Sequence, residues 1–147
     1  MATVNYNGNT VSDEEVKKVL EAVSNFFQAP VTVTSGDRNF VPKGGSATSW
    51  HLSKKAADFH VDNNSDADVF RYMKVFVSNF FKMGYRYEFI RHGDFTATTG
   101  AHLHIACKGT ANDFGYVEFI EEGITSSTKN SYRTIANIPL IGATLRA

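Results

Sequence analysis

Two apolar stripes at helical spacing constrain the fold of this chain more than any other feature of its sequence. The first follows Ser12, which stands three residues ahead of a glutamate as in a capping box, and Pro30 ends the pattern. The second runs from a cap at Ser65 or Asp66 to Gly84. The apolar members of the two stripes are Val16, Val19, Leu20, Val23, Phe26 and Phe27, and then Val69, Phe70, Met73, Val77, Phe80 and Phe81. The sequence therefore predicts two main helices, each with one face in a shared core.

Short alternating or β-branched segments surround these helices. Strands are predicted over residues 31–34, 56–61, 85–90, 102–107 and 116–120. Polar, glycine-bearing loops are predicted over 37–49 and 93–100, a lead-in or short strand over the first ten residues, and a short helical turn with an extended tail over the last 25. This order favours an α+β fold, a single domain of residues 1–147 with two main helices packed on a small antiparallel sheet.

Composition excludes several classes of function. Fifteen basic and fifteen acidic residues cancel to a formal charge of zero, which argues against binding to nucleic acid, because such affinity is mostly electrostatic. No stretch approaches the ~20 apolar residues of a membrane span, and the polar segment Met1 to Thr10 is no signal peptide, so we expect no membrane insertion. The single cysteine, Cys107, excludes an internal disulfide and is expected to be a packed, inert residue. We expect a monomer.

Histidines and a carboxylate at defined spacing stand out against this background. His51 precedes Asp58 by seven residues, and His102 and His104 lie two apart on a predicted strand, where such positions share a face. Imidazole nitrogens and one carboxylate oxygen suit Zn²⁺, and three protein ligands leave a position for a water that attacks a carbonyl. His51, Asp58 and His104 are therefore the candidate zinc ligands, and His102 is left to face the substrate.

Four neighbouring residues are further candidates for this site. Arg38 follows a predicted strand and supplies a fixed positive charge for a substrate carbonyl, a carboxylate or a developing oxyanion. Ser49 and Trp50 come just before the first histidine and are candidate substrate-binding residues, although the tryptophan has packing as its alternative role. His60 shares a strand face with Asp58, so it either orients that carboxylate or makes an unrelated hydrogen bond.

These motifs together resemble the zinc D-Ala-D-Ala carboxypeptidases and their relatives, the lysostaphin-type and murein endopeptidases. Their signature has Ser-x-His, then six residues to an Asp within Ala-x-Asp, then a distant His-x-His or Glu-x-x-His. Residues 49–58 keep the Ser, His, Ala and Asp at that spacing, and residues 102–104 fit the second half. The stretch 35–38 resembles the Ser-Gly-x-Arg of the family. The similarity covers roughly residues 31–107.

The resemblance implies a function as well as a fold. It implies a hedgehog/DD-peptidase-like domain with zinc held by His51, Asp58 and His104, and with Arg38 contacting the peptide near the scissile bond. The implied activity is hydrolysis of an amide bond in peptidoglycan stem peptides, by D,D-carboxypeptidase or endopeptidase action. Because this chain shows no signal peptide, we expect a cell-wall enzyme delivered by lysis, by a virion or by a secretion machine.

Two positions depart from the family pattern. A glycine often follows the first histidine by three residues, and Lys54 stands there in this chain, so we expect the local loop to differ. Many members carry an acidic residue three positions before the last zinc histidine, where this chain has Ala101. The zinc-activated water then needs another base. His102 is the first candidate, followed by His92 and Asp94 in or beside the loop before the last ligand strand.

Glu88 is a weaker candidate for the base, because a strand glutamate beside tyrosines is usually just exposed. If none of these groups reaches the metal, the domain is a zinc-containing binding module that catalyses weakly or not at all. Ala101 favours this alternative. A third hypothesis is a metal-free domain whose histidines merely cluster, and stoichiometric zinc in the purified protein would exclude it.

Overall fold

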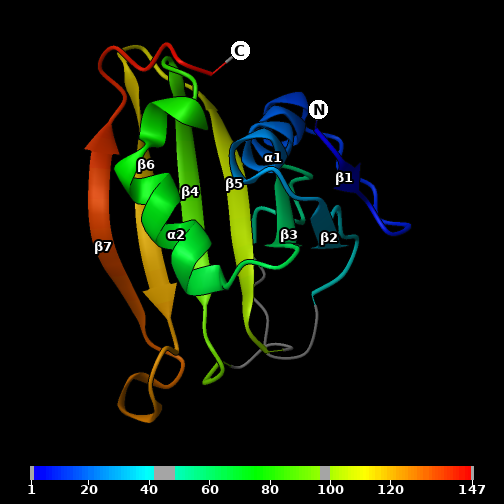
Figure 1. Cartoon of the computed structure of the whole chain (residues 1–147). Helices are drawn as coiled ribbons and strands as arrows, with labels where there is room; N and C mark the ends of the chain where they lie inside the picture. The colour runs from blue at the N-terminus through cyan, green and yellow to red at the C-terminus, as the bar shows by residue number, and fades with distance from the viewer. Residues whose placement is uncertain (1, 42–48, 97–99, 147) are drawn as a thin grey trace.

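The computed structural model describes residues 2–41, 49–96 and 100–146, and its frame is a sheet with both helices on one face (Figure 1). The elements in chain order are β1 (Val4–Asn5), α1 (Glu14–Phe27), β2 (Val31–Ser35), β3 (Ala56–Val61), α2 (Asp66–Val75), the 3₁₀ turn η1 (Val77–Asn79), β4 (Tyr85–His92), β5 (His102–Thr110), β6 (Gly115–Glu122), η2 (Ser126–Thr128) and β7 (Tyr132–Pro139). The α+β class is confirmed. In these residues no helix is long and apolar enough to cross a membrane.

The sheet is larger than expected, and it is mixed. Its seven strands lie in the order β1-β2-β3-β5-β4-β6-β7, with parallel pairing of β1 to β2 and of β4 to β6. The prediction of a small antiparallel sheet is therefore wrong. The short link between Thr110 and Gly115 crosses the start of β4. Gly84 hydrogen-bonds to both ends of this link, because its amide donates to the Phe114 carbonyl and its carbonyl accepts from the Ala111 amide. The chain thus enters β6 on the far side of β4, and this crossing makes the pair parallel.

The first helix begins one residue later than its sequence pattern suggested. Asp13 is the N-cap and its carboxylate accepts from the Val16 amide, whereas the Ser12 hydroxyl donates to Asp37, just after β2. Both residue types cap well, but the hydrogen bond to the Asp37 carboxylate engages the serine elsewhere. Tertiary contact thus decides between two adjacent caps.

The second helix is shorter than predicted. Ser65 caps it as expected, but it ends at Val75, and a 3₁₀ turn follows. Successive helical positions point about 100° apart, so a regular helix cannot turn two adjacent bulky rings fully into one core. Phe80 and Phe81 are both wholly buried, and they achieve this by leaving the helix. Gly84 therefore ends no helix and serves the strand crossing instead.

The two faces of the sheet have opposite character. Under the helices lies one apolar core that includes Val33, Phe59, Phe89, Leu103, Ile105, Val117 and Phe119. Because side chains alternate along a strand, the residues between these core positions project from the helix-free face. His102 and His104 thus flank Leu103 and point away from the core. Cys107 is buried as expected, and burial raises the pKa of its thiol to about 11, which makes it inert.

A buried ion pair anchors the C-terminal segment to the first helix. Arg146 makes a two-pronged contact with Glu15, with Nη2 2.9 Å from Oε1 and Nη1 on Oε2. Their side chains are 5% and 9% exposed, so neither charge is well solvated once the other is removed.

We predict that Arg146→Met lowers the free energy of unfolding by about 3–5 kcal/mol, because it leaves the Glu15 carboxylate buried without a partner. Urea denaturation measures this. The control is Arg133→Met, whose exposed pair with Glu121 is expected to contribute less than about 1 kcal/mol. Adding Glu15→Met to the first variant should recover much of the loss. Equal midpoints for the two single variants would show that the pair anchors nothing.

Candidate metal centre

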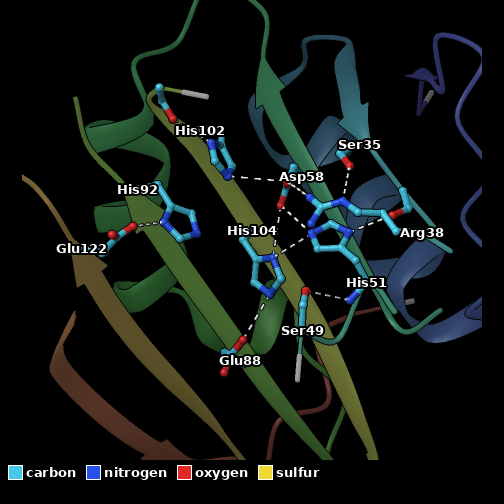
Figure 2. A network of polar contacts seen from close by, with 12 residues as sticks. Ser35, Arg38, Ser49, His51, Asp58, Glu88, His92, His102, His104 and Glu122 are labelled. Carbon is cyan, nitrogen blue, oxygen red and sulfur yellow. Dashed lines mark hydrogen bonds and ion pairs between the residues drawn. The ribbon is translucent and has the colours of Figure 1, made fainter. Parts of the chain in front are cut away.

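His51, Asp58 and His104 converge at one point on the helix-free face of the sheet (Figure 2). His51 Nε2 lies 2.9 Å from Asp58 Oδ1, His104 Nδ1 lies 3.1 Å from the same oxygen, and the two nitrogens are 3.2 Å apart. All three residues are buried, at 2%, 5% and 6% exposure. The structure thus brings together the three residues that the sequence indicated as candidate zinc ligands.

The strand register delivers two of the three residues. Asp58 on β3 stands directly opposite His104 on β5 in an antiparallel pair, so both side chains leave the same face as neighbours. His51 comes from the turn just before β3, where its amide donates to the Ser49 hydroxyl and its carbonyl accepts from the Lys54 amide.

Lys54 makes the turn that a glycine was expected to make. Its φ is 60°, in the left-handed region where a side chain costs about 1–2 kcal/mol. The lysine thus adopts a conformation that glycine favours, and whether the loop differs from that of the family stays a prediction. The turn returns the chain to β3 with His51 facing Asp58.

A backbone carbonyl orients the ring of His51. Gly36 O lies 2.8 Å from Nδ1 of that histidine. The carbonyl is held where it is because the chain passes tightly against the N-terminal segment, with the Asp37 amide donating to Thr10 O. A Cβ on residue 36 would lie 2.1 Å from the same Thr10 oxygen, so only glycine fits. The glycine of the Ser-Gly-x-Arg motif is thereby explained.

Glu88 orients the other histidine, and this was not foreseen. Its Oε1 lies 3.1 Å from Nε2 of His104, and its side chain is only 17% exposed. The expectation of an ordinary exposed strand glutamate is wrong. Although burial favours the neutral acid, the hydrogen bond from His104 lowers the pKa of Glu88, so the group is a carboxylate.

These outer contacts decide which nitrogens carry hydrogen. The Gly36 carbonyl and the Glu88 carboxylate only accept, so Nδ1 of His51 and Nε2 of His104 are the donors. In the neutral rings the opposite nitrogens then present lone pairs, and both face Asp58 Oδ1. Three electron pairs directed at one point repel one another unless a cation lies among them.

The chemistry and spacing of the donor set fit a metal ion. Two imidazoles and a carboxylate are typical zinc ligands, and bonds of ~2.0–2.1 Å at tetrahedral angles separate the ligand atoms by about 3.3 Å. The three separations here are 2.9, 3.1 and 3.2 Å. The outer hydrogen bonds from each histidine are those that metal-binding histidines make.

Without a metal, a proton takes the cation's place. Burial disfavours charge on His104, but its hydrogen bonds with Asp58 and Glu88 raise the pKa of the ring to about 9. Burial likewise opposes the Asp58 carboxylate, but hydrogen bonds from His104 and His51 hold its pKa well below the usual range. The Asp58 carboxylate thus stays ionised at neutral pH. A metal ion that binds at the cluster has to displace the proton of His104.

The second oxygen of Asp58 has two partners of its own. Arg38 Nη2 lies 3.2 Å from Oδ2, while its Nε donates to the Ser35 hydroxyl at 3.2 Å. His102 Nε2 lies 3.5 Å from the same oxygen. Arg38 therefore braces a metal ligand in this structure, and its guanidinium, with a side chain 19% exposed, borders the site.

His102 is turned so that its Nε2 faces the centre. Its Nδ1 lies 2.8 Å from the Gly100 carbonyl, which makes this nitrogen a donor, and its Nε2 points toward Asp58 Oδ2 at 3.5 Å. The ring stacks on His92 with centroids 4.4 Å apart. An imidazole held in this orientation at the edge of the cluster is placed to exchange a proton at Nε2.

His92 belongs to a second imidazole–carboxylate pair beside the centre. Its Nδ1 lies 2.5 Å from Glu122 Oε1, on the neighbouring strand β6 (Figure 2). Burial, together with the adjacent charge of His102 when that ring is protonated, lowers the pKa of His92 to about 3, so it is neutral. Burial also raises the pKa of Glu122.

The structure does not bring every sequence candidate to the centre. His60 pairs with Asp66 at 3.0 Å, which supports the hypothesis of an unrelated hydrogen bond. Asp94 is exposed and shares no hydrogen bond with the cluster among the described contacts. Trp50 is partly buried in the turn that carries His51.

Glu88 and Glu122 were missed or underrated as functional residues. Alternation along the strand could have indicated them, because each lies an even number of residues from another polar position on its own strand and so shares a face with it. That signal gains meaning only when the neighbouring strands are known.

Comparison with known proteins bears on the same residues. Residues 3–96 match the sequence profile of the family Peptidase M15. The chain belongs to this family. It is the family of the zinc D-Ala-D-Ala carboxypeptidases, as the motifs indicated, and its membership supports a metallopeptidase. Searches of curated proteins and of solved structures return no match.

The match to Peptidase M15 includes Arg38, His51 and Asp58 but stops before His102 and His104. The β3–β5 pairing places His104, which lies beyond the matched residues, directly opposite Asp58, which lies within them.

We predict about one zinc ion per chain, bound at this centre. Elemental analysis of the purified protein measures it, and a His51→Ala, His104→Ala double variant should hold almost none, since only one of the three donors remains. His60→Ala is the matched control and should retain the full content. A parent that stays metal-free after zinc is supplied would contradict the assignment.

We also predict that Gly36→Ala weakens zinc binding about tenfold or more and lowers stability by about 1–3 kcal/mol. The added Cβ overlaps the Thr10 carbonyl and so displaces the oxygen that orients His51. Chelator competition and thermal unfolding measure the two effects. Thr34→Ala, an exposed change on the preceding strand, is the control. An unchanged zinc affinity in Gly36→Ala would show that this carbonyl does not matter for the site.

Proposed function

We propose that this protein is a zinc-dependent peptidase that hydrolyses an amide bond in peptidoglycan stem peptides. The observation that carries the proposal is the convergence of three electron-pair donors from His51, Asp58 and His104 in a chain of the M15 family. Zinc bound there supplies Lewis acidity, which polarises a carbonyl and makes a water nucleophilic near neutral pH. The remaining requirement is a set of protein groups that handle protons and charge.

His102 is the proposed general base and acid. Its free Nε2 faces the centre, and the Gly100 carbonyl fixes the tautomer that accepts a proton at that nitrogen. Acceptance of the water's proton and its later delivery to the leaving amine require one group that reaches both, and a ring at the edge of the cluster is suited to this. Ala101 leaves no acidic residue at the usual family position, so the histidine takes the role.

His92 and Glu122 support this base. The stacked ring of His92 limits rotation of His102, and Glu122 in turn fixes His92 through its Nδ1. Because His92 stays neutral, it adds no repulsion when His102 becomes charged during the reaction. This arrangement supplies orientation without a competing charge.

Arg38 is the proposed electrostatic arm. It holds Asp58 in place with one nitrogen, and its remaining N–H groups border the site, where a substrate carboxylate or a developing oxyanion is stabilised by fixed positive charge. Ser49 and Trp50 lie in the turn that carries His51, and we propose that they contact the peptide there. The three donors lie on the helix-free face of the sheet, and we propose that an extended peptide reaches them from that side.

The test is hydrolysis of purified peptidoglycan and of synthetic stem peptides, with mass analysis of the products. We expect cleavage that a chelator abolishes and zinc restores. Release of free D-alanine identifies carboxypeptidase action, and internal fragments identify an endopeptidase. Zinc bound at full stoichiometry without any cleavage would instead support a binding module.

We predict that His102→Ala lowers kcat by about 10²–10⁴-fold while the zinc affinity stays within about threefold, because the ring handles protons and does not hold the metal. Arg71→Ala, an exposed change on α2 across the sheet, is the control and should leave kcat unchanged. If His102→Ala retains the parental kcat, the base lies elsewhere. If it loses zinc, the residue is a ligand.

A further inference from the structure

We infer that Glu88 is a positioning residue of the metal centre, one that holds His104 by its outer nitrogen and strengthens its bond to the metal. The inference rests on the proposed function only in taking the centre to be a zinc site. Its evidence is the contact between Glu88 Oε1 and His104 Nε2 at 3.1 Å, between side chains that are 17% and 7% exposed.

The strand register makes this contact a built feature of the sheet. On β4, Glu88 stands opposite Ala106, while Ile90 stands opposite His104. Glu88 and His104 are therefore diagonal neighbours on the same face, and the small Ala106 leaves room for the glutamate beside the ring. Figure 2 shows the carboxylate approaching the ring from the side opposite Asp58.

The Glu88 carboxylate has a single hydrogen-bond partner in the described structure, and that partner is His104. Its side chain is largely removed from water, at 17% exposure. A half-buried charge with a single partner is costly unless that partner needs it, and a metal-binding imidazole does.

The physical effect follows from the chemistry of imidazole. A carboxylate that accepts the Nε2 hydrogen pushes electron density toward Nδ1 and stops the ring from rotating, so Nδ1 becomes the better and better-aimed donor. The negative charge also lies near the position of the cation and offsets part of the cost of burying it. Outer partners of this kind typically change metal affinity by about 10–100-fold.

The same geometry separates Glu88 from the role of a base. The ring of His104 stands between the glutamate and the point where the three donors meet, because Nδ1 faces that point and Nε2 faces Glu88. A group behind a ligand acts through that ligand. Glu88 therefore supplies orientation and charge, and His102 remains the group with open access.

The experiment compares Glu88→Ala and Glu88→Gln with the parent by zinc affinity, measured through competition with a chelator, and by the visible spectrum of the Co²⁺ form. We expect Glu88→Ala to bind zinc about 10–100-fold more weakly and to show an altered Co²⁺ spectrum. Glu88→Gln should recover part of the loss, because its amide oxygen still accepts the Nε2 hydrogen without carrying charge.

The matched control is Glu118→Gln, which changes the residue paired with Glu88 in register on β6. Glu118 accepts from the Thr134 hydroxyl at 3.1 Å and has no contact with His104 among the described residues. The zinc affinity of the Glu118→Gln variant should therefore match that of the parent.

A zinc affinity within twofold of the parent in both Glu88 variants would overturn the inference. If kcat also fell strongly in those variants, Glu88 would be a proton-transfer group. A protein that hydrolyses no peptide but loses zinc affinity in Glu88→Ala would leave this inference standing and remove only the proposed peptidase activity.

Discussion

The pairing of Asp58 with His104 across β3 and β5 is the constraint on which the rest of the site depends. In an antiparallel pair two facing residues share one side of the sheet, so this single register puts a carboxylate oxygen and an imidazole nitrogen 3.1 Å apart. A slip of β5 by one residue would turn His104 into the apolar core beneath the helices and leave Asp58 without its partner. The burial of Phe59, Leu103 and Ile105 on the other face therefore fixes the centre as firmly as any polar contact does.

Each of the three donor residues is held in place by a further residue. The Gly36 carbonyl orients His51, Glu88 orients His104, and Arg38 braces Asp58. These partners come from the end of β2, from β4 and from the loop after β2, so much of the sheet contributes to one point. Such support costs stability locally, as the left-handed Lys54 and the buried charges show, and it fixes the tautomers that make the cluster a receptor for a cation.

Membership in Peptidase M15 and the geometry complement each other. The family match covers the first two ligands and the arginine, and the sheet adds the third ligand beyond its end. The departure at Ala101, which made a weakly catalytic module a serious alternative, is offset by an imidazole at the next position with its free nitrogen toward Asp58. We therefore propose that His102 performs here the chemistry that an acidic residue performs elsewhere.

The sequence alone predicted the α+β class, two amphipathic helices, most of the strands, and the three residues of the metal centre. It could do so because helical periodicity and alternation are local patterns, and because the motifs around His51, Asp58 and His104 resemble those of a known family. The tertiary structure alone decided the mixed seven-strand sheet, the early end of α2 before Phe80, and the partners of each histidine. Glu88 shows why. Its function depends on which residue lies diagonally across a strand boundary, and that neighbour is set by long-range register, which no local pattern along one strand contains.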